Sequence, residues 1–120
     1  MSSHVQPCYK GFKAGAAIAQ HSFVKFGSDR ETVVPSGDAE KAIGICMTAD
    51  VQSGGECEIA LLGGGALVKL SGSVALGDSI KSDASGLGAV GGAGEWSPGI
   101  AMDAGVAGDV VSILLDGHKA

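Results

Sequence analysis

Glycine and proline interrupt this sequence so often that only short secondary-structure elements fit between them. Of the 120 residues, 21 are glycine and 3 are proline, and the longest stretch free of both, residues 16–26, has eleven residues. Isolated helices shorter than about 12 residues are marginal, whereas strands of about 5–6 residues are typical. Residues 23–26 (FVKF) within that stretch also favour a strand. The spacing therefore predicts an all-β fold.

Two segments carry the alternation expected of strands. In residues 56–61 (ECEIAL) the odd positions are apolar and both glutamates face the other way. In residues 110–115 (VVSILL) the odd positions are again apolar, but Val110 and Leu114 are apolar too, so we expect both faces of this strand to be covered. The remaining strand candidates, separated by glycine-containing turns, are residues 32–34, 42–47, 66–70, 79–81 and 100–102.

The chain also repeats itself. Residues 17–25 match residues 73–81 at an offset of 56, and residues 44–51 match residues 99–106 at an offset of 55. At an offset of 54, four residues of the first half match residues of the second: Gly54 matches Gly108, Ile59 matches Ile113, Leu61 matches Leu115 and Gly63 matches Gly117. Two copies are too few for a solenoid, which needs about three or more repeats to bury a continuous core.

We therefore predict one compact β-barrel, β-clip or jelly-roll-like, with an internal pseudo-twofold repeat. The domain is expected to cover residues 14–120, and its two related halves about residues 14–65 and 70–117. An extended N-terminal arm, residues 1–13, is expected to precede it.

Composition and charge exclude several classes of protein. The apolar fraction of 45% is too high for a disordered chain. A net charge of −5 and a pI near 4.9 argue against nucleic-acid binding, which needs a basic face. The apolar runs are far shorter than the ~20 residues of a membrane span, and no secretory signal is visible. Three cysteines without CxxC spacing indicate neither a disulfide framework nor a zinc site.

The residues also predict no enzyme and no cofactor. Residues 86–91 (GLGAVG) match the GxGxxG pattern, but residues 92–98 (GAGEWSP) cannot begin the helix that a phosphate site requires, so we interpret this segment as a surface loop. The histidines, at positions 4, 21 and 118, lack metal-ligand spacing. Cys46 and Cys57 align with Ala101 and Val111 in the repeat, which predicts that they fill apolar core positions.

The whole pattern resembles the small bacteriophage capsid decoration, or cement, proteins. The resemblance covers about residues 11–117, and its segments are 16–20 (AAIAQ), 24–25 (VK), 41–45 (KAIGI), 55–61 (GECEIAL), 74–80 (VALGDSI), 98–102 (PGIAM) and 108–115 (GDVVSILL). It implies a Gly/Ala-rich β-barrel without catalysis, usually a homotrimer on the outer surface of the phage head, made in the host cytoplasm. It further implies the major capsid protein as partner, with an N-terminal arm that reaches over neighbouring capsid subunits, and neither nucleic acid nor membrane.

The resemblance supplies no fixed site motif, so contact residues are inferred from side-chain chemistry. Val5, Pro7, Tyr9 and Phe12 are apolar residues in an otherwise polar N-terminal segment, and we expect them to contact the capsid or another subunit. Trp96 is the one tryptophan and follows a glycine-rich loop. A lone tryptophan is a common interface anchor, and the alternative is that it plugs a lean barrel.

Two other functions are compatible with parts of the pattern. A small non-catalytic β-barrel module that binds a ligand or carbohydrate on a virion or cell surface would need an aromatic-lined pocket, and the chain offers five aromatic residues. A small β-barrel hydrolase would need a histidine or cysteine beside an acid, and the repeat assigns Cys46 and Cys57 to apolar positions instead.

Overall fold

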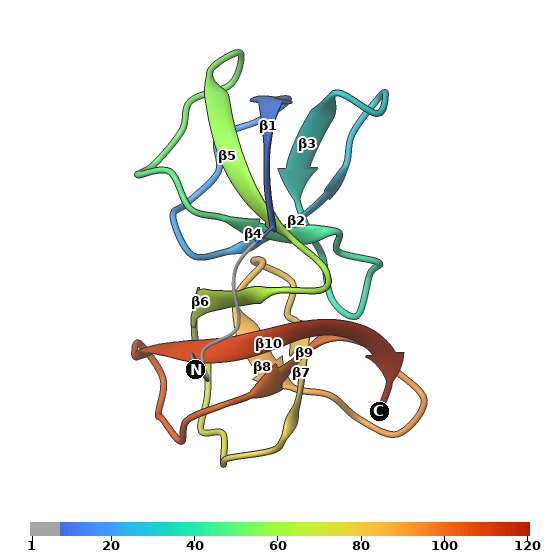
Figure 1. Ribbon diagram of the computed structural model, residues 1–120, viewed down its shortest axis with the longest axis vertical. Coiled ribbons are helices and arrows are strands. Elements are labelled where there is room, and N and C mark those ends of the chain that lie inside the picture. Colours follow the sequence, from blue (N-terminus) through green and yellow to red (C-terminus); the bar gives the residue numbers. More distant parts are fainter. Residues whose placement is uncertain (1–7) are drawn as a thin grey trace, which may run out of the picture.

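The computed structural model describes residues 8–120, and within them the chain forms ten strands and no helix (Figure 1). The predicted all-β class is confirmed. Five strands form unit 1: β1 (Cys8–Ala14), β2 (Phe23–Phe26), β3 (Thr32–Pro35), β4 (Gly44–Cys46) and β5 (Glu56–Leu61). Five more form unit 2: β6 (Gly65–Lys69), β7 (Ser79–Ser82), β8 (Gly88–Val90), β9 (Trp96–Ala101) and β10 (Val110–Lys119).

Each half of the repeat forms its own five-stranded unit, a closed barrel in unit 1 and a sheet in unit 2, whereas the sequence led us to expect the two halves to share one barrel. Unit 1 is a closed barrel in the order β1-β3-β2-β4-β5, completed by parallel pairing of β1 with β3 at Ala14 and Val33. Unit 2 has the corresponding order β6-β10-β9-β7-β8, and a single parallel bridge between Leu70 and Gly88 joins its two ends. Each strand of unit 1 thus has a counterpart in unit 2, and the counterparts are neighbours in the same order.

The repeat extends to the turns. The two units contain corresponding antiparallel bridges, Ile18 to Val51 and Val74 to Gly105, so the structural counterpart of Val51 is Gly105 rather than Val106, the match taken from the sequence. Left-handed backbone occurs at matched positions as well: Ala39 has a φ of 53° where unit 2 has Gly94 with a φ of 79°. A left-handed conformation is unfavourable for residues with a Cβ, so unit 1 carries backbone strain that the glycine of unit 2 avoids.

A lysine–glutamate pair is also repeated, which explains why Lys25 and Lys81 occupy equivalent strand-end positions. Lys25 Nζ lies 2.8 Å from Glu40 Oε1, and Lys81 Nζ lies 3.1 Å from Glu95 Oε1. Each glutamate also accepts a hydrogen bond from a main-chain N–H three residues before it, in both cases at 2.7 Å. The pairs therefore fasten equivalent turns to the second strand of each unit.

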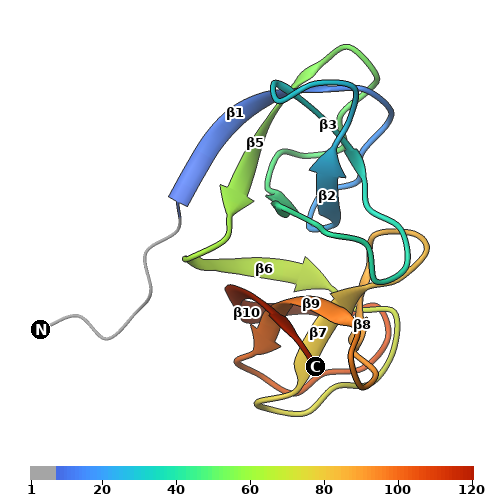
Figure 2. The same cartoon turned by 90° about the vertical axis from the view of Figure 1, so that its right-hand side faces the viewer.

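The core of unit 2 is completed by residues of unit 1. Unit 1 has its own core, which contains both Cys46 and Cys57, buried as predicted. The second cluster combines unit 2 residues with four from unit 1, Phe23, Ala42, Ile45 and Ala60. Figure 2 shows unit 1 standing over β6, with the rest of unit 2 beyond it. The two units are therefore packed into one body rather than joined only by residues 62–64.

Hydrogen bonds join the units where Phe23 enters this cluster. The Lys69 N–H donates to the His21 carbonyl at 2.9 Å, and the Phe23 N–H donates to the Gly86 carbonyl at 2.7 Å. Residues 21–23 of unit 1 thus bond both to the end of β6 and to the turn before β8, and the side chain of Phe23 is fully buried.

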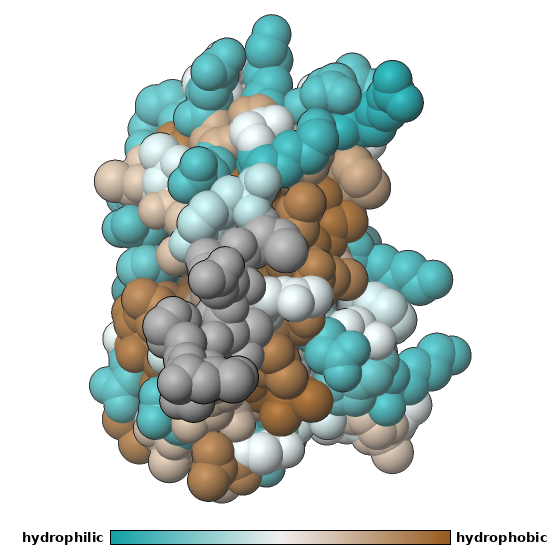
Figure 3. All heavy atoms as spheres, in the orientation of Figure 1, coloured by the Kyte–Doolittle hydropathy of each residue, from teal (hydrophilic) through white to brown (hydrophobic). Residues whose placement is uncertain are grey.

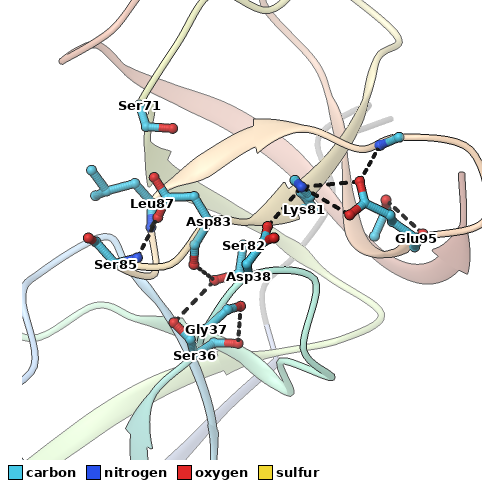
Figure 4. A network of polar contacts seen from close by, with 12 residues as sticks. Ser36, Gly37, Asp38, Ser71, Lys81, Ser82, Asp83, Ser85, Leu87 and Glu95 are labelled. Atoms are coloured by element: carbon cyan, nitrogen blue, oxygen red, sulfur yellow. Dashed lines mark hydrogen bonds and ion pairs between the residues drawn. The ribbon is translucent and has the colours of Figure 1, made fainter.

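A polar network fastens the same boundary (Figure 4). Lys81 Nζ lies 2.8 Å from Asp38 Oδ1 of unit 1 as well as close to Glu95 of its own unit. These hydrogen bonds, first with Asp38 and then with Glu95, raise the pKa of Lys81. The Ala39 N–H donates to the Ser82 carbonyl at 2.9 Å, and Ser82 Oγ donates to the Ser36 carbonyl at 3.4 Å.

Two segments differ from the sequence-based expectation. Residues 8–13, assigned to the arm, form most of β1, because they pair with β5 in the register Cys8 to Leu61 through Lys13 to Glu56. Residues 86–91, expected to be a loop, contain β8 at Gly88–Val90. A Cβ at position 88 would lie 3.2 Å from Ile80 Cγ2 and from Leu70 Cδ2, so Gly88 packs closely against core side chains.

Candidate docking surface

The outer side of unit 2 is an apolar sheet face. Along β10, Val110, Ser112 and Leu114 point away from the core, between Val111, Ile113 and Leu115, which are buried. Pairing places Leu67 of β6 opposite Ser112 and Ile100 of β9 opposite Leu114, and the Met102 N–H donates to the Ser112 carbonyl. We call this surface the unit 2 face and define it by five residues: Leu67, Ile100, Met102, Val110 and Leu114.

These side chains are at least partly exposed, so the expectation that both faces of residues 110–115 are covered is wrong. Val110 is 45% exposed and Met102 is 42% exposed. Figure 3 shows hydrophobic residues gathered on the side of the molecule where β6 and β10 lie. Exposed apolar patches of this kind mark interaction sites in soluble proteins.

The fold itself does not require this face to be apolar. At the equivalent outward positions of β5, unit 1 has Glu56 where unit 2 has Val110, and Glu58 where unit 2 has Ser112. Both glutamates are exposed on a strand with the same inward pattern. The apolar residues of the unit 2 face are therefore a property of unit 2 rather than a consequence of building a five-stranded barrel.

A groove of about 320 Å³ lies where the unit 2 face meets unit 1. Tyr9 of β1 and Met47 of unit 1 line one side, and Leu67 and Met102 line the other. Tyr9 is 48% exposed. Among the predicted contact residues, Tyr9 thus lies beside the apolar surface, and it contributes the one aromatic ring in the groove.

Two other predicted contact residues, Phe12 and Trp96, do not line this groove. Val5 and Pro7 lie outside the described residues. Phe12 is only 6% exposed and belongs to the core of unit 1, where its ring meets Phe26 edge-on and Lys10 Nζ lies 4.5 Å from its centroid. Phe12 is therefore mainly a core residue of unit 1.

Trp96 begins β9 rather than lying in a loop. Its ring lies against Gly117, where a Cβ would come within 2.6 Å of Cζ2, and Lys41 Nζ of unit 1 lies 5.5 Å from the ring centroid. The indole Nε1 is buried and has no hydrogen-bond partner among the described atoms. The ring thus packs against Gly117 and Lys41 but belongs to neither core cluster, so the plug and the interface interpretations both stay predictions.

The structure contains one Ser–His contact that the sequence analysis missed. Ser79 Oγ lies 2.9 Å from His118 Nε2, and His118 Nδ1 lies 2.7 Å from the Asp116 carbonyl, so Nδ1 donates and Nε2 accepts from Ser79. The residues are 39 positions apart, and only strand order brings them together. The third group is a main-chain carbonyl rather than a carboxylate, and we assign the contact to fastening the end of β10 onto β7.

Neither metal binding nor a helical membrane anchor has support in residues 8–120. No group of three or more His, Cys, Asp or Glu side chains there could hold a metal ion. That same part of the chain has no helix long and apolar enough to cross a membrane.

The fold is similar to that of a known phage head structure. The head fiber gp8.5 N base in bacteriophage phi29 superposes with a TM-score of 0.75 at 12% sequence identity, over 94% of this chain and 97% of that one. No curated protein sequence matches this chain.

A sequence profile describing phage cement proteins matches residues 10–116, which include all of the strands except the ends of β1 and β10. The match agrees with a fold that offers apolar surface rather than a reactive cluster. The chain therefore belongs to the phage cement protein family, and it is a non-catalytic structural protein of the phage head, at the surface of the virion.

Proposed function

We propose that this protein binds the outer surface of the major capsid protein shell as a homotrimer and stabilises the DNA-filled head. The observation that carries the proposal is the match of the cement family over residues 10–116. The exposed apolar face of unit 2 and the adjacent groove at Tyr9 support it, because they provide contact surface that the barrels themselves do not need.

The physical basis is mass action on the assembled shell. A ligand that binds only the intact form stabilises that form by RT ln(1 + [L]/Kd), or about 2.7 kcal/mol when its concentration is 100 times Kd. A cement protein bound across capsid subunits has the same effect on their separation. A trimer presents each contact three times, so modest single contacts combine into strong binding through avidity.

The shell contact is expected to include the residues before β1 together with Tyr9. Val5 and Pro7 are apolar residues in this segment, and Tyr9 is the neighbouring residue that the structure shows exposed. Deletion of residues 1–7 leaves β1 intact, whereas deletion of residues 1–13 would remove the strand that closes unit 1.

The test is cosedimentation with phage heads that lack the protein. The intact chain should bind, and the 1–7 deletion and Tyr9→Ser should bind more weakly while keeping the thermal unfolding midpoint of the intact chain. Val90→Ser is the matched control, since Val90 is 47% exposed on β8, and it should bind normally. Failure of the intact chain to bind heads, or to raise their temperature of DNA release, would refute the proposal.

A further inference from the structure

The contact between the two units is made by two unlike surfaces. Phe23, Ile45 and Ala60 point away from the interior of unit 1, since their strand neighbours Val24 and Cys46 belong to the core of unit 1. All three outward side chains are nevertheless fully buried, because unit 2 covers them. Unit 1 thus supplies an apolar surface, and unit 2 supplies the surface that receives it.

The repeat places a second copy of the supplying surface on unit 2. The positions equivalent to Phe23, Ile45 and Ala60 are Ser79, Ile100 and Leu114, at offsets of 56, 55 and 54. All three are partly exposed, and Ile100 and Leu114 belong to the unit 2 face. Unit 2 therefore carries the same kind of surface that unit 1 uses to hold unit 2, but within the chain no third unit covers it.

The receiving surface is repeated in the same way on unit 1. In unit 2, Val68 and Leu115 belong to the cluster that Phe23 enters. Their equivalents in unit 1 are Phe12 and Leu61, and these line an apolar groove of about 450 Å³. We call it the unit 1 groove and define it by its lining residues: Lys10, Phe12, Phe26, Arg30, Glu31, Ile43 and Leu61.

The sizes of the side chains are complementary between the two free surfaces. Inside the chain, the large Phe23 meets a receiving surface with the smaller Val68. On the free surfaces the sizes are reversed: the supplying side has the small Ser79, and the receiving side has the large Phe12 and Phe26, the latter 50% exposed. Such an exchange preserves the total volume at a contact, which is the condition for close packing.

We propose that the unit 2 face of one copy docks onto the unit 1 groove of the next copy, and so repeats between chains the contact that joins the two units within a chain. The occupant of the unit 2 face is a second copy of this protein. Because the two surfaces are unlike, the contact is heterologous and forms a ring where the rotation closes. This inference rests on the proposed homotrimer and arranges its six related five-stranded units, two from each chain, around one axis.

Charge substitutions on each surface test the inference. Met102→Glu alters the unit 2 face, and Phe26→Glu alters the unit 1 groove; both side chains are substantially exposed, so both variants should fold. Light scattering should give about 35 kDa for the wild type, three times 11.7 kDa, and a monomer for each variant. Val90→Glu, at an exposed site outside both surfaces, should remain trimeric, and Leu114→Ser is a second face variant should Met102→Glu fail to fold.

Mixing the two monomeric variants is the decisive step. Met102→Glu keeps its groove and Phe26→Glu keeps its face, so a head-to-tail contact predicts a 1:1 complex of about twice 11.7 kDa that grows no further. A face-to-face contact would instead let Phe26→Glu, whose face is intact, pair with itself. A dimer of Phe26→Glu alone, or a mixture that stays monomeric, therefore overturns the inference. A wild-type chain that is monomeric at its highest soluble concentration also overturns it.

Head binding separates this inference from the proposed function. If the wild type forms the heterologous trimer but does not cosediment with heads, the proposed function fails and the inference stands. If the wild type binds heads and Met102→Glu also remains trimeric, the proposed function stands and the inference fails, with the capsid as the occupant of the unit 2 face.

Discussion

Phe23 is the residue whose removal should uncouple the two units. Its side chain is fully buried in the shared cluster, although it belongs to a strand of unit 1 whose own core is made by other residues. Truncation of a buried phenylalanine to alanine costs about 3–5 kcal/mol. With an unfolding entropy of about 2.1 cal/mol/K per residue, a chain of 120 residues should lose roughly 12–20 °C in Tm.

The chain contains a separate probe for each unit. Trp96, the one tryptophan, lies in unit 2, and its fluorescence follows that unit during denaturation by urea. Cys46 and Cys57 are buried in unit 1, and burial and the neighbouring Cys46 raise the pKa of Cys57 to about 11, so both thiols should react with a disulfide reagent only when unit 1 opens. Cys8→Ser in every protein restricts the thiol signal to unit 1.

In the parent protein the two transitions should coincide, because unit 2 takes part of its core from unit 1. In Phe23→Ala the fluorescence transition should move to a lower urea concentration than the thiol transition. Unit 2 loses a side chain that fills its core, whereas unit 1 keeps its own core. Leu76→Ala, at a 73% exposed site, should change stability by less than about 0.5 kcal/mol. Coincident transitions in Phe23→Ala, or a loss below about 1 kcal/mol, would show that Phe23 does not couple the units.

Two further predictions concern the left-handed residues of the equivalent turns and the dependence of thermal stability on pH in the acid range. Ala39→Gly should stabilise the protein by about 0.5–1 kcal/mol, because it relieves left-handed strain of about 1–2 kcal/mol at the entropic cost of a glycine, and Gly94→Ala should destabilise it by a similar amount in thermal unfolding. The hydrogen bond from Lys25 and one from a main-chain N–H lower the pKa of Glu40, so its contribution is present above about pH 4.3, the unfolded value, and is lost as the pH falls through the lower folded value. Glu40→Gln should therefore lower the Tm at pH 7 and leave it unchanged near pH 2, unlike the exposed Glu56→Gln; an equal effect at both pH values would contradict this.

Strands whose side chains alternate could be predicted from the sequence, and the strands built from glycine could not. Residues 23–26 and 56–61 form strands with the predicted bounds: residues 56–59 alternate between exposed and buried side chains, and residues 23–26 combine aromatic and β-branched residues that favour strands. β8 has three residues and begins at Gly88, which leaves no side-chain pattern to recognise, and the close packing of Gly88 against Leu70 and Ile80 is not visible in the local sequence. β1 was missed since its partner β5 lies about 48 residues away and local pattern does not encode that pairing.

The sequence did indicate the docking surface, but its apolar residues were interpreted as buried within the chain. Val110 and Leu114 are apolar at outward positions, and a strand that is apolar on both sides is usually buried on both sides. The structure shows that these positions are on an open side of unit 2. Neither composition nor periodicity distinguishes a side chain covered within its own chain from one that another molecule covers, because both satisfy the same apolar pattern.

The internal repeat provides the comparison that a single pattern lacks. Inward positions agree between the units, with Ile59 matched by Ile113 and Leu61 by Leu115, since each unit needs an apolar core. An outward position differs, with Glu56 in unit 1 and Val110 in unit 2, and folding does not demand that difference. Because burial within the chain explains the first kind of position and not the second, the outward residues that changed between the units are where binding to other subunits is to be sought.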